Sequence, residues 1–399
     1  MDVPTTNPRT ASSKFPSTTS TTTTPHYTPT VDTTHSTTTT AGAQPGTPTR
    51  EYDLILVGPS GFVGKLATQH LLRTYGTSDA PFSWALAVRN EERLAQMHRE
   101  IGKAERLAEV PVILGDVDDP AFCATLAQKS KVPAASLTPY SLHGTKLVVA
   151  CVEHGTHYVD ISGEMLWIKE NIDKFHEQAQ AKGVRIVHAC GLGSIPADLS
   201  VYLMLQRLRH HRNEPKELNF PNGPMYSSLG GGSMMSYATL IVMAKEHGKI
   251  LTMLHPHFLA PPSASSVSAE KTKSQKQQQK EQQQQQCGFV SVAPKIFGVG
   301  WDSDIHRFTA PLWLAALDDE IVVRSAGLLG YPAFRYVEAQ TYSPSFFGFM
   351  SAWWTFVGAY LLAACLYFAP TRWLLTKLRP PGSGPNRYIR ERGWGKMFY

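Results

Sequence analysis

The stretch that decides the fold is DLILVGPSGFVGKLATQHLL, which runs from Asp53 to Leu72. It opens with an apolar run, residues 54–57, of the kind that a parallel strand buried on both faces requires. Three glycines follow, and the residues around them repeat apolar side chains at helical spacing, at Val63, Leu66, Ala67 and Leu71. The stretch therefore predicts a strand, a glycine-rich turn and a helix that packs on a sheet.

Each glycine has its own expected role in this turn. Gly58 permits the sharp exit from the strand, Gly61 lets a diphosphate approach the backbone, and Gly64 lets the helix pack closely. The free N–H groups and the positive dipole end of the helix then attract phosphate. The spacing G-x-x-G-x-x-G is loose, and alone it is equally compatible with a plain turn. In this context we expect a dinucleotide site formed by Gly58, Ser60, Gly61, Phe62, Val63 and Gly64.

Strands and helices continue to alternate along the chain. Apolar runs predict strands at 84–88, 110–114, 158–161 and 184–190. Helices are expected between them, including one that stops at Gly155 and one over 165–182 that ends at Gly183. Such alternation implies right-handed crossovers. The predicted fold class is α/β, a Rossmann-like doubly wound parallel sheet.

The residues after the second predicted strand indicate which dinucleotide binds. NAD enzymes usually place a carboxylate there for the ribose 2′-OH, whereas this chain has Arg89 and Asn90. Arginine pairs with a 2′-phosphate in a fork geometry, so we expect NADP as the cofactor. The alternative is that Arg89 is a solvated cation and Glu91 a helix-start residue. Asp116 is expected either to contact the adenine amino group or to cap the helix that Pro120 begins.

The composition argues against several other classes of function. Lys and Arg number 38 against 32 acidic residues, and no long basic run indicates a nucleic-acid surface. The five cysteines form no C-x-x-C pair and no H-E-x-x-H is present, so we expect no metal site. Two low-complexity segments are predicted to be disordered, a Thr/Ser/Pro-rich tail over 1–50 and a Gln-rich insertion over 261–287.

Five motifs point to a family: YDLILVGPSGFVGKL, LTPYSLHG, ACVEHGTHYVDISGE, ACGLGSIPADL and GSGPNRYIRERGW. Together they resemble the saccharopine dehydrogenase-like oxidoreductases, which are relatives of the bacterial trans-acting enoyl reductases. The resemblance implies a nucleotide-binding domain over 51–198 and a smaller α+β domain over 199–342. It also implies a lipid-related or membrane-associated reductase. Unlike its relatives, the chain has Pro133 in the fourth strand, which predicts a weaker or shorter strand because proline removes a ladder donor.

The candidate catalytic residues are Tyr140, His143 and Tyr158. No tyrosine has a lysine four residues later, so the tyrosine–lysine pair of short-chain dehydrogenases is absent. The resemblance places Pro139 and Tyr140 at the nicotinamide end, where we expect Tyr140 to position the cofactor. Asp160 or Glu164 is expected to cap the helix that follows. The sequence assigns no single catalytic acid.

The third region, 343–399, contains an uncharged apolar run over 346–369. As a helix it would reach ~36 Å, against ~30 Å of bilayer hydrocarbon, so it can span or lie on a membrane. Pro370 is expected to end it, and basic residues follow as at a cytosolic membrane face. The alternatives are a helix buried between domains or within a homodimer. A lipid droplet, a mitochondrion and the plasma membrane are all compatible locations.

Two hypotheses from different classes follow. The first is an NADP-dependent oxidoreductase on a lipid surface, acting on a small-molecule or lipid-like carbonyl or enoyl substrate in lipid or glycolipid metabolism. The second is a membrane- or lipid-droplet-associated nucleotide-binding protein with little turnover. A true saccharopine dehydrogenase is disfavoured, because a soluble amino-acid enzyme has no use for the apolar helix.

Overall fold

The computed structural model describes most of the chain beyond residue 49. The described ranges are 50–77, 80–101, 106–210, 217–226, 231–248, 258–261, 289–291, 298–310, 315–331, 334–392 and 394–397. All of them belong to the second of two units, 1–48 and 49–399. The predicted tail and the predicted insertion lie outside the described residues, apart from Arg50 and Pro261.

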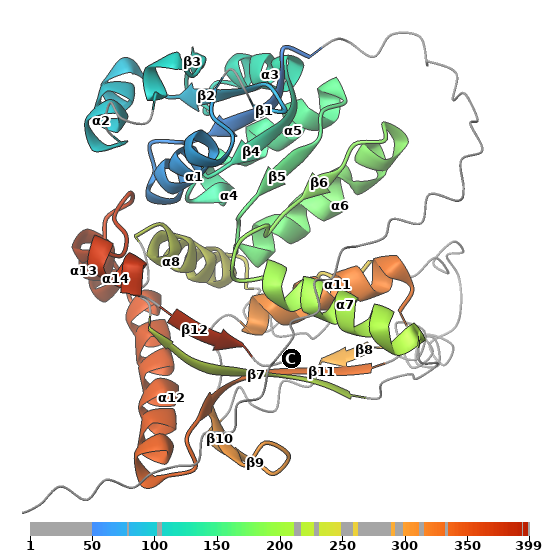
Figure 1. The fold of residues 1–399 in the computed structure, drawn as a ribbon, viewed down its shortest axis with the longest axis vertical. Helices are drawn as coiled ribbons and strands as arrows, with labels where there is room; N and C mark the ends of the chain where they lie inside the picture. Colours follow the sequence, from blue (N-terminus) through green and yellow to red (C-terminus); the bar gives the residue numbers. More distant parts are fainter. Residues whose placement is uncertain are drawn as a thin grey trace, which may run out of the picture. The chain divides into compact units, whose positions relative to one another are not determined.

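The first sheet has six parallel strands in the order β3-β2-β1-β4-β5-β6 (Figure 1). The strands are β1 Tyr52–Val57, β2 Trp84–Val88, β3 Val112–Leu114, β4 Ser130–Ala135, β5 Tyr158–Asp160 and β6 Ile186–Val187. The helices between them are α1 Phe62–Thr74, α2 Glu91–Ile101, α3 Pro120–Lys129, α4 Tyr140–His143, α5 Thr145–His154 and α6 Met165–Ala181, with a 3-10 turn η2 Leu107–Glu109. The strand order reverses between β1 and β4, where open α/β sheets bind ligands. The Rossmann-like prediction is confirmed.

Residues 54–57 of β1 are all apolar because their alternating side chains enter two different cores. Ile55 and Val57 lie in the core formed with α3 and α5. Leu54 and Leu56 lie in the core formed with α1 and α2. Helices therefore cover both faces of the sheet, as an uninterrupted apolar strand requires.

The fourth strand forms in spite of Pro133. The His157 N–H, just before β5, donates to Lys131 O at 3.1 Å, whereas the Ser136 N–H donates to Val57 O of β1 at 2.9 Å. The backbone N–H and C=O groups of odd-numbered residues in β4 therefore point toward β5. Pro133 is on that side, and β4 pairs with β5 only from Ala134 onward. The missing donor therefore leaves the ladder between β4 and β1 intact.

The last predicted strand of the sheet is shorter than the 184–190 run suggests. Only Ile186 and Val187 pair, and Val187 is exposed. The strand lies at the edge of the sheet, so one side of it has no neighbour in the sheet order. Two residues later Ala189 takes a positive φ of 59°, which turns the chain away.

Part of the stripe predicted for α1 faces inward, because Ala67 and Leu71 pack against the core formed with β2 and α2. The buried residues of α1 are Gly64, Thr68 and Leu72, while Val63 is 46% exposed. Gly64 must face inward because the backbone of Gly58 and Pro59 lies against it, and this rotates Val63 outward. The predicted helix ends are confirmed, since Gly155 and Gly183 take φ values of 67° and 65° after α5 and α6.

The second sheet is mixed, with the order β12-β7-β11-β10-β9 and β8 paired to β11. Its strands are β7 Glu217–Tyr226, β8 Phe289–Ser291, β9 Gly300–Asp302, β10 Arg307–Ala310, β11 Phe334–Tyr342 and β12 Trp394–Met397. The helices of this part are α7 Ile195–His210, α8 Gly231–Glu246 and α11 Ala315–Leu329. The α+β prediction is confirmed. The boundary predicted at residue 198 lies inside α7, and the boundaries stay a prediction.

The C-terminal region is more than a helix and a tail. Helix α12 Phe346–Tyr367 is followed by α13 Ala369–Leu378 and α14 Arg387–Arg392. Strand β12 then returns to the second sheet and pairs antiparallel with β7. Pro370 opens α13 within its first turn, and the Arg372 Nη1 donates to the carbonyls of Leu366 and Tyr367, which closes the end of α12.

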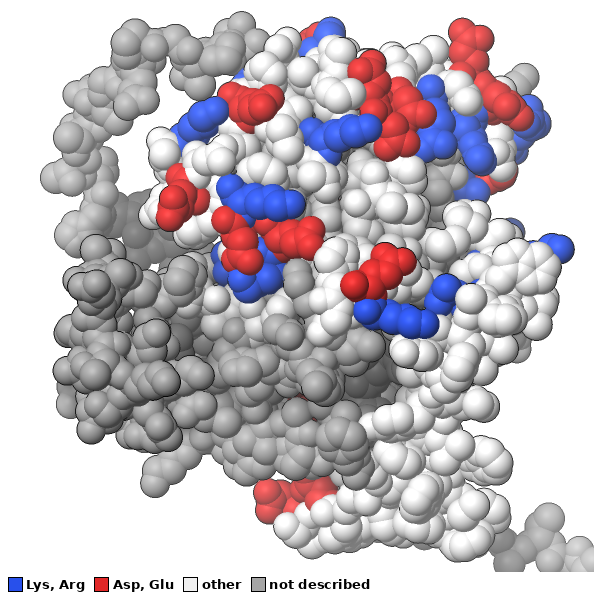
Figure 2. All heavy atoms as spheres, turned by 180° about the vertical axis from the view of Figure 1, so that it is seen from behind, with Lys and Arg blue, Asp and Glu red and all other residues white. Residues whose placement is uncertain are grey.

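Helix α12 is long and apolar enough to cross a membrane by length and composition, with mean hydropathy 1.5. Only Gly348, Ala352 and Leu366 are buried along it. Figure 2 shows charged side chains gathered over the part of the molecule that contains the first sheet, whereas the surface formed by α12 carries none. The helix therefore presents an extended apolar face to its surroundings.

Candidate functional site

The glycine loop has the geometry that a phosphate turn requires. Gly58 takes a φ of 79°, and a Cβ there would meet Ser136 O at 2.6 Å, so only glycine fits. A Cβ on Gly64 would overlap the backbone of Gly58 and Pro59, which is the close packing of helix on loop. Both positions are thus fixed by the protein's own backbone.

Gly61 is different, because the protein leaves room beside it. A Cβ there would meet nothing closer than Gly58 O at 3.5 Å, an ordinary contact. Gly61 is the N-cap of α1, makes no side-chain cap, and no acidic residue lies in the first turn. The Gly61 N–H donates to Gly58 O at 3.2 Å, and the N–H groups of Phe62 and Val63 remain available to an anion.

Arg89 and Asp116 lie at the ends of β2 and β3 and form an ion pair, with Arg89 Nε 3.3 Å from Asp116 Oδ2. Both side chains are half exposed, so the guanidinium keeps donors free for a 2′-phosphate. The Asn90 side chain instead accepts from the Arg93 N–H at 3.0 Å and caps α2. Sequence reasoning placed Asn90 in the cofactor site without recognising this cap.

The alternative role expected for Asp116, as the cap of α3, is wrong. Asp119 is that cap, and its carboxylate accepts from the Ala121 N–H at 2.9 Å. Asp116 accepts from the Asp118 N–H at 3.0 Å. This hydrogen bond and the ion pair with Arg89 hold the Asp116 side chain at the end of β3, where an adenosine would lie.

His143 contacts the same loop. Its Nδ1 lies 3.0 Å from Asp118 Oδ1, and this hydrogen bond holds the pKa of the Asp118 carboxyl below its usual value. The Lys146 ammonium also contacts Asp118 O. His143 is therefore tied to the loop after β3, toward the adenosine end rather than the reacting end.

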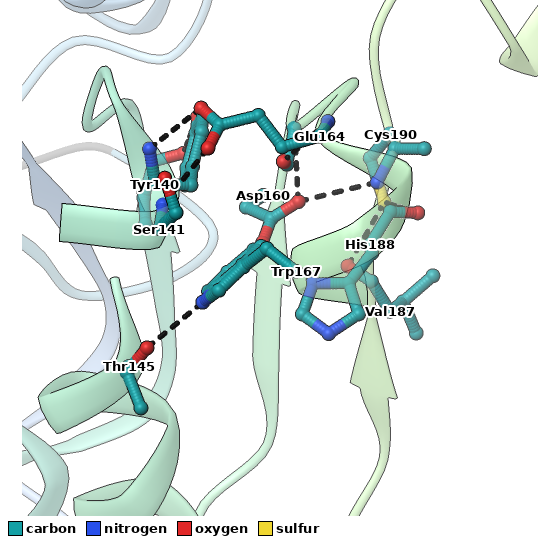
Figure 3. Close-up of polar contacts among 12 residues, drawn as sticks. Tyr140, Ser141, Thr145, Asp160, Glu164, Trp167, Val187, His188 and Cys190 are labelled. Atoms are coloured by element: carbon teal, nitrogen blue, oxygen red, sulfur yellow. Dashed lines mark hydrogen bonds and ion pairs between the residues drawn. The ribbon is translucent and has the colours of Figure 1, made fainter. Parts of the chain in front are cut away.

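Glu164 organises the loop that contains Pro139 and Tyr140 (Figure 3). Its carboxylate accepts from the Tyr140 N–H at 2.7 Å and from the Ser141 N–H at 2.9 Å. These are the first N–H groups of α4, so Glu164 stabilises α4 and leaves its own helix, α6, without a side-chain cap. The expectation that Asp160 or Glu164 caps α6 is wrong. Glu164 is fully buried, which makes these bonds hard to replace.

Asp160, at the end of β5, anchors the segment after β6 (Figure 3). Its carboxylate contacts His188 Nδ1 at 2.7 Å and accepts from the N–H groups of Ser162 and Ala189. Its carbonyl accepts from the Cys190 N–H at 2.7 Å. The bond to Ala189 supports the positive φ of that residue. Asp160 thus fixes the chain between the two sheets.

The hydroxyl groups of Tyr140 and Tyr158 lie within the core. Tyr140 Oη donates to Ala135 O at 3.0 Å, and Tyr158 is fully buried. Burial first, and the charge of Asp160 second, raise the pKa of both hydroxyls well above the usual value. The contacts of Tyr140 hold the loop after β4 in place, and its expected role in positioning the cofactor stays a prediction.

Helix α8 reaches the Thr138–Tyr140 loop from the second part of the chain. A Cβ on Gly232, in its first turn, would lie 3.5 Å from Thr138 Oγ1. One turn on, Ser236 Oγ donates to Glu164 Oε1 at 2.9 Å. The first turn of α8 thus lies against the loop that follows β4.

Three of these residues were missed by sequence reasoning: Glu164 as an anchor of α4, Ser236 and His188. One signal was available for His188, because it follows β6 and Asp160 ends β5, and neighbouring parallel strands end at the same edge. Nothing in the sequence linked Ser236 to Glu164. Among the described residues, no group of three or more His, Cys, Asp and Glu side chains could hold a metal ion.

The site fits a dinucleotide. Gly61 leaves the space that a diphosphate needs, the first turn of α1 offers N–H groups, and Arg89 lies where a 2′-phosphate would be bound. All of these residues follow the carboxyl ends of neighbouring parallel strands.

Comparison with known proteins agrees with this geometry. Residues 54–187 match the family model of the saccharopine dehydrogenase NADP binding domain. A Mycobacterium tuberculosis protein, provisionally named a trans-acting enoyl reductase, is 30% identical over 357 residues, which are 87% of this chain and 80% of that protein. A trans-acting enoyl reductase of Mycobacterium bovis is 39% identical over 158 residues, 40% of this chain and 36% of the relative.

Among solved structures, apo saccharopine dehydrogenase (L-Glu forming) of Saccharomyces cerevisiae aligns with a TM-score of 0.35 and 16% identity, over 44% of this chain and 35% of that one. The first mycobacterial relative matches over most of both chains, and the nucleotide-binding region matches a domain named for its cofactor. The chain therefore belongs to the saccharopine dehydrogenase-like oxidoreductases, together with the trans-acting enoyl reductases, and its cofactor is NADP.

Proposed function

We propose that the protein is an NADPH-dependent reductase that acts on an enoyl or carbonyl group of a lipid-like substrate at a lipid surface. The observation that carries this proposal is the placement of α8. Its first turn lies against Thr138, in the loop expected at the nicotinamide end, and one turn on Ser236 donates to Glu164. Its buried side also packs on the C-terminal helices, in a cluster of Met234, Ala238 and Leu366.

Helix α8 therefore joins the two features that a lipid reductase needs. One is the end of the cofactor site at which a hydride is transferred, and the other is the apolar helix α12. Partly buried side chains of α12 and α13, Leu362 and Leu375, extend the same cluster. A substrate whose apolar part stays in lipid would have only the length of α8 to cover before its polar end reached the cofactor.

The names of the relatives support an enoyl substrate. Two mycobacterial proteins that share this family are named trans-acting enoyl reductases. NADPH, when bound, supplies the hydride, and reduction of an enoyl group takes up one proton as well. The loop held by Glu164 orients the substrate end of the site, and Arg89 and the first turn of α1 hold the phosphates. With the hydroxyls of Tyr140 and Tyr158 buried, we assign the proton to water.

The test is NADPH oxidation by the full chain in vesicles that contain an α,β-unsaturated acyl lipid. The wild type should oxidise NADPH only when the unsaturated lipid is present, with a saturated lipid as the blank. Gly61→Leu should abolish the rate, because the added side chain occupies the space left for the diphosphate. Product analysis by mass spectrometry should show a gain of two hydrogens on the lipid.

A second function is favoured by one observation, the burial of both candidate tyrosine hydroxyls. It is a membrane-associated NADP-binding protein with little turnover, for instance at a lipid droplet. Tight NADPH binding with no oxidation across enoyl and carbonyl lipids would support that function and contradict the reductase. Binding and turnover are therefore measured on the same preparation.

A further inference from the structure

The motif GSGPNRYIRERGW, near the C-terminus, has no role in the site described so far. The structure places part of it against the glycine loop. We call residues 382–392 the C-terminal arm. A Cβ on Gly384 would overlap the ring of Phe62, so the arm backbone lies directly on that ring. The Arg390 guanidinium lies over the same ring, 5.8 Å from its centroid.

The arm is internally ordered, which fixes where Arg390 lies. Ser383 Oγ donates to Pro380 O at 2.7 Å, and the Asn386 side chain accepts from the Ile389 N–H at 2.9 Å to cap α14. In Figure 1 the arm belongs to the red segment that contains α14. The contact with Phe62 therefore joins the end of the chain to the first residue of α1.

Arg390 differs from the other arginines of α14 in what its side chain contacts. Arg387 Nε pairs with Glu391 at 2.6 Å, and Arg392 lies over the ring of Tyr388, whose hydroxyl it contacts. Within the described residues, Arg390 makes no side-chain hydrogen bond or ion pair, and its contact is the ring of Phe62. All five N–H donors of its guanidinium are thus available.

The first turn of α1 has no acidic residue and no side-chain cap. A diphosphate bound there would accept hydrogen bonds from the N–H groups of the turn. The one side-chain cation of this turn, Lys65, pairs with Glu100. We propose that Arg390 supplies the cation for the diphosphate and that the C-terminal arm is part of the NADP site. The proposal rests on the cofactor assignment and adds a binding residue from the far end of the chain.

The test is a fluorescence titration of the full-length protein in detergent, once with NADPH and once with NADH. NADPH and NADH share the diphosphate and differ at the 2′-position. Arg390→Ala should therefore weaken the binding of both cofactors by a similar factor, about 10- to 100-fold, which is the worth of a charge-assisted hydrogen bond. Arg390→Lys, which keeps the charge, should recover part of that loss.

Arg392→Ala is the matched control, because it removes the same charge from the same short helix. It should leave both dissociation constants within about twofold of the wild type. The proposal is overturned if Arg390→Ala binds both cofactors as the wild type does. A loss confined to NADPH would assign Arg390 to the 2′-phosphate and overturn the diphosphate role, and an equal loss in Arg392→Ala would reduce it to general surface charge.

This experiment reads cofactor binding alone and needs no substrate. If the lipid reductase proposal fails, the binding constants of the variants still decide the role of the arm. Conversely, if Arg390→Ala binds both cofactors normally, only the role of the arm is contradicted, and the reductase proposal is still tested by the turnover of the wild type.

Discussion

Glu164 shows at the scale of one residue how the site is held together. A single buried carboxylate receives hydrogen bonds from Tyr140, Ser141 and Ser236, which come from the loop after β4 and from α8. A carboxylate offers enough acceptor sites for all three, whereas an amide offers only one oxygen. The position of the Tyr140 loop is therefore set by a residue that itself faces away from solvent.

Arg89 is the residue on which the choice of cofactor depends. Replacing it with alanine removes the fork that pairs with a 2′-phosphate, while the diphosphate contacts at α1 stay intact. For Arg89→Ala we expect the dissociation constant of NADPH to rise about 10- to 100-fold and that of NADH to change little. Fluorescence titration with both cofactors measures the ratio.

The control is Arg93→Ala, at the third residue of α2, which removes a neighbouring cation. It should leave the ratio of the two constants unchanged. Equal weakening of NADPH and NADH in Arg89→Ala would show that Arg89 does not recognise the 2′-phosphate. The pattern expected of Arg390 is the opposite one, so the two arginines are distinguished by the same measurement.

The glycine loop and Arg89 were predictable because both signals are local. A glycine trio after an apolar strand, and an arginine directly after the next strand, are adjacent to the structure that gives them meaning. The hydrogen bonds of Glu164 to α4 and of Asp160 to His188 join residues far apart in the chain. Such contacts follow from the packing of whole elements, which one sequence does not specify.

At the scale of elements, α11 holds a short segment of chain in place by two side chains one turn apart. Glu320 accepts from the Leu259 N–H at 2.8 Å, and the Arg324 Nη1 donates to Leu259 O at 3.0 Å. Burial raises the pKa of Glu320 from 4.5 to about 7. The pKa of Asp318 in the same helix is also raised by burial, to about 9.

Glu320 therefore makes the stability of this part depend on pH. Because its pKa is higher in the folded state, its contribution is complete below the unfolded value of 4.5 and is lost as the pH rises through about 7. The loss amounts to about 3 kcal/mol between those limits. For Glu320→Gln we expect the fall in Tm from pH 5 to pH 8 to be smaller than in the wild type.

Glu177→Gln, on the exposed side of α6, serves as the control and should retain the wild-type dependence. The same fall in Tm for wild type and Glu320→Gln would show that Glu320 does not titrate in this range. Asp318 titrates in both proteins, so it cancels in the comparison of the two slopes.

The elements themselves were predicted well where their pattern was long. The helices ending at Gly155 and Gly183 have both apolar periodicity and a glycine stop. The strand at 186–187 was overestimated, because an apolar run does not reveal that its strand lies at the edge of the sheet. The return of β12 to the second sheet was also unforeseen, since four residues carry too little pattern.

At the scale of the whole molecule, α12 carries an exposed apolar stripe with a regular spacing. Phe347, Trp354 and Leu361 are seven residues apart and are 80%, 70% and 63% exposed. Seven residues are close to two helical turns, so the three side chains lie along one face. Burying such a face away from water is favourable by about 1.5–3 kcal/mol for each large apolar side chain.

We therefore expect the full-length protein to float with vesicles of phosphatidylcholine and phosphatidylserine in a density gradient. Trp354→Glu combined with Leu361→Glu should keep most of the protein at the bottom, because two charges on the stripe oppose its burial in lipid. Leu199→Glu, at an exposed apolar position of α7, is the matched control and should float as the wild type does. The wild type could instead stay at the bottom of the gradient as a dimer that the double substitution separates. In that case the stripe is a subunit interface, and the proposed action at a lipid surface is contradicted.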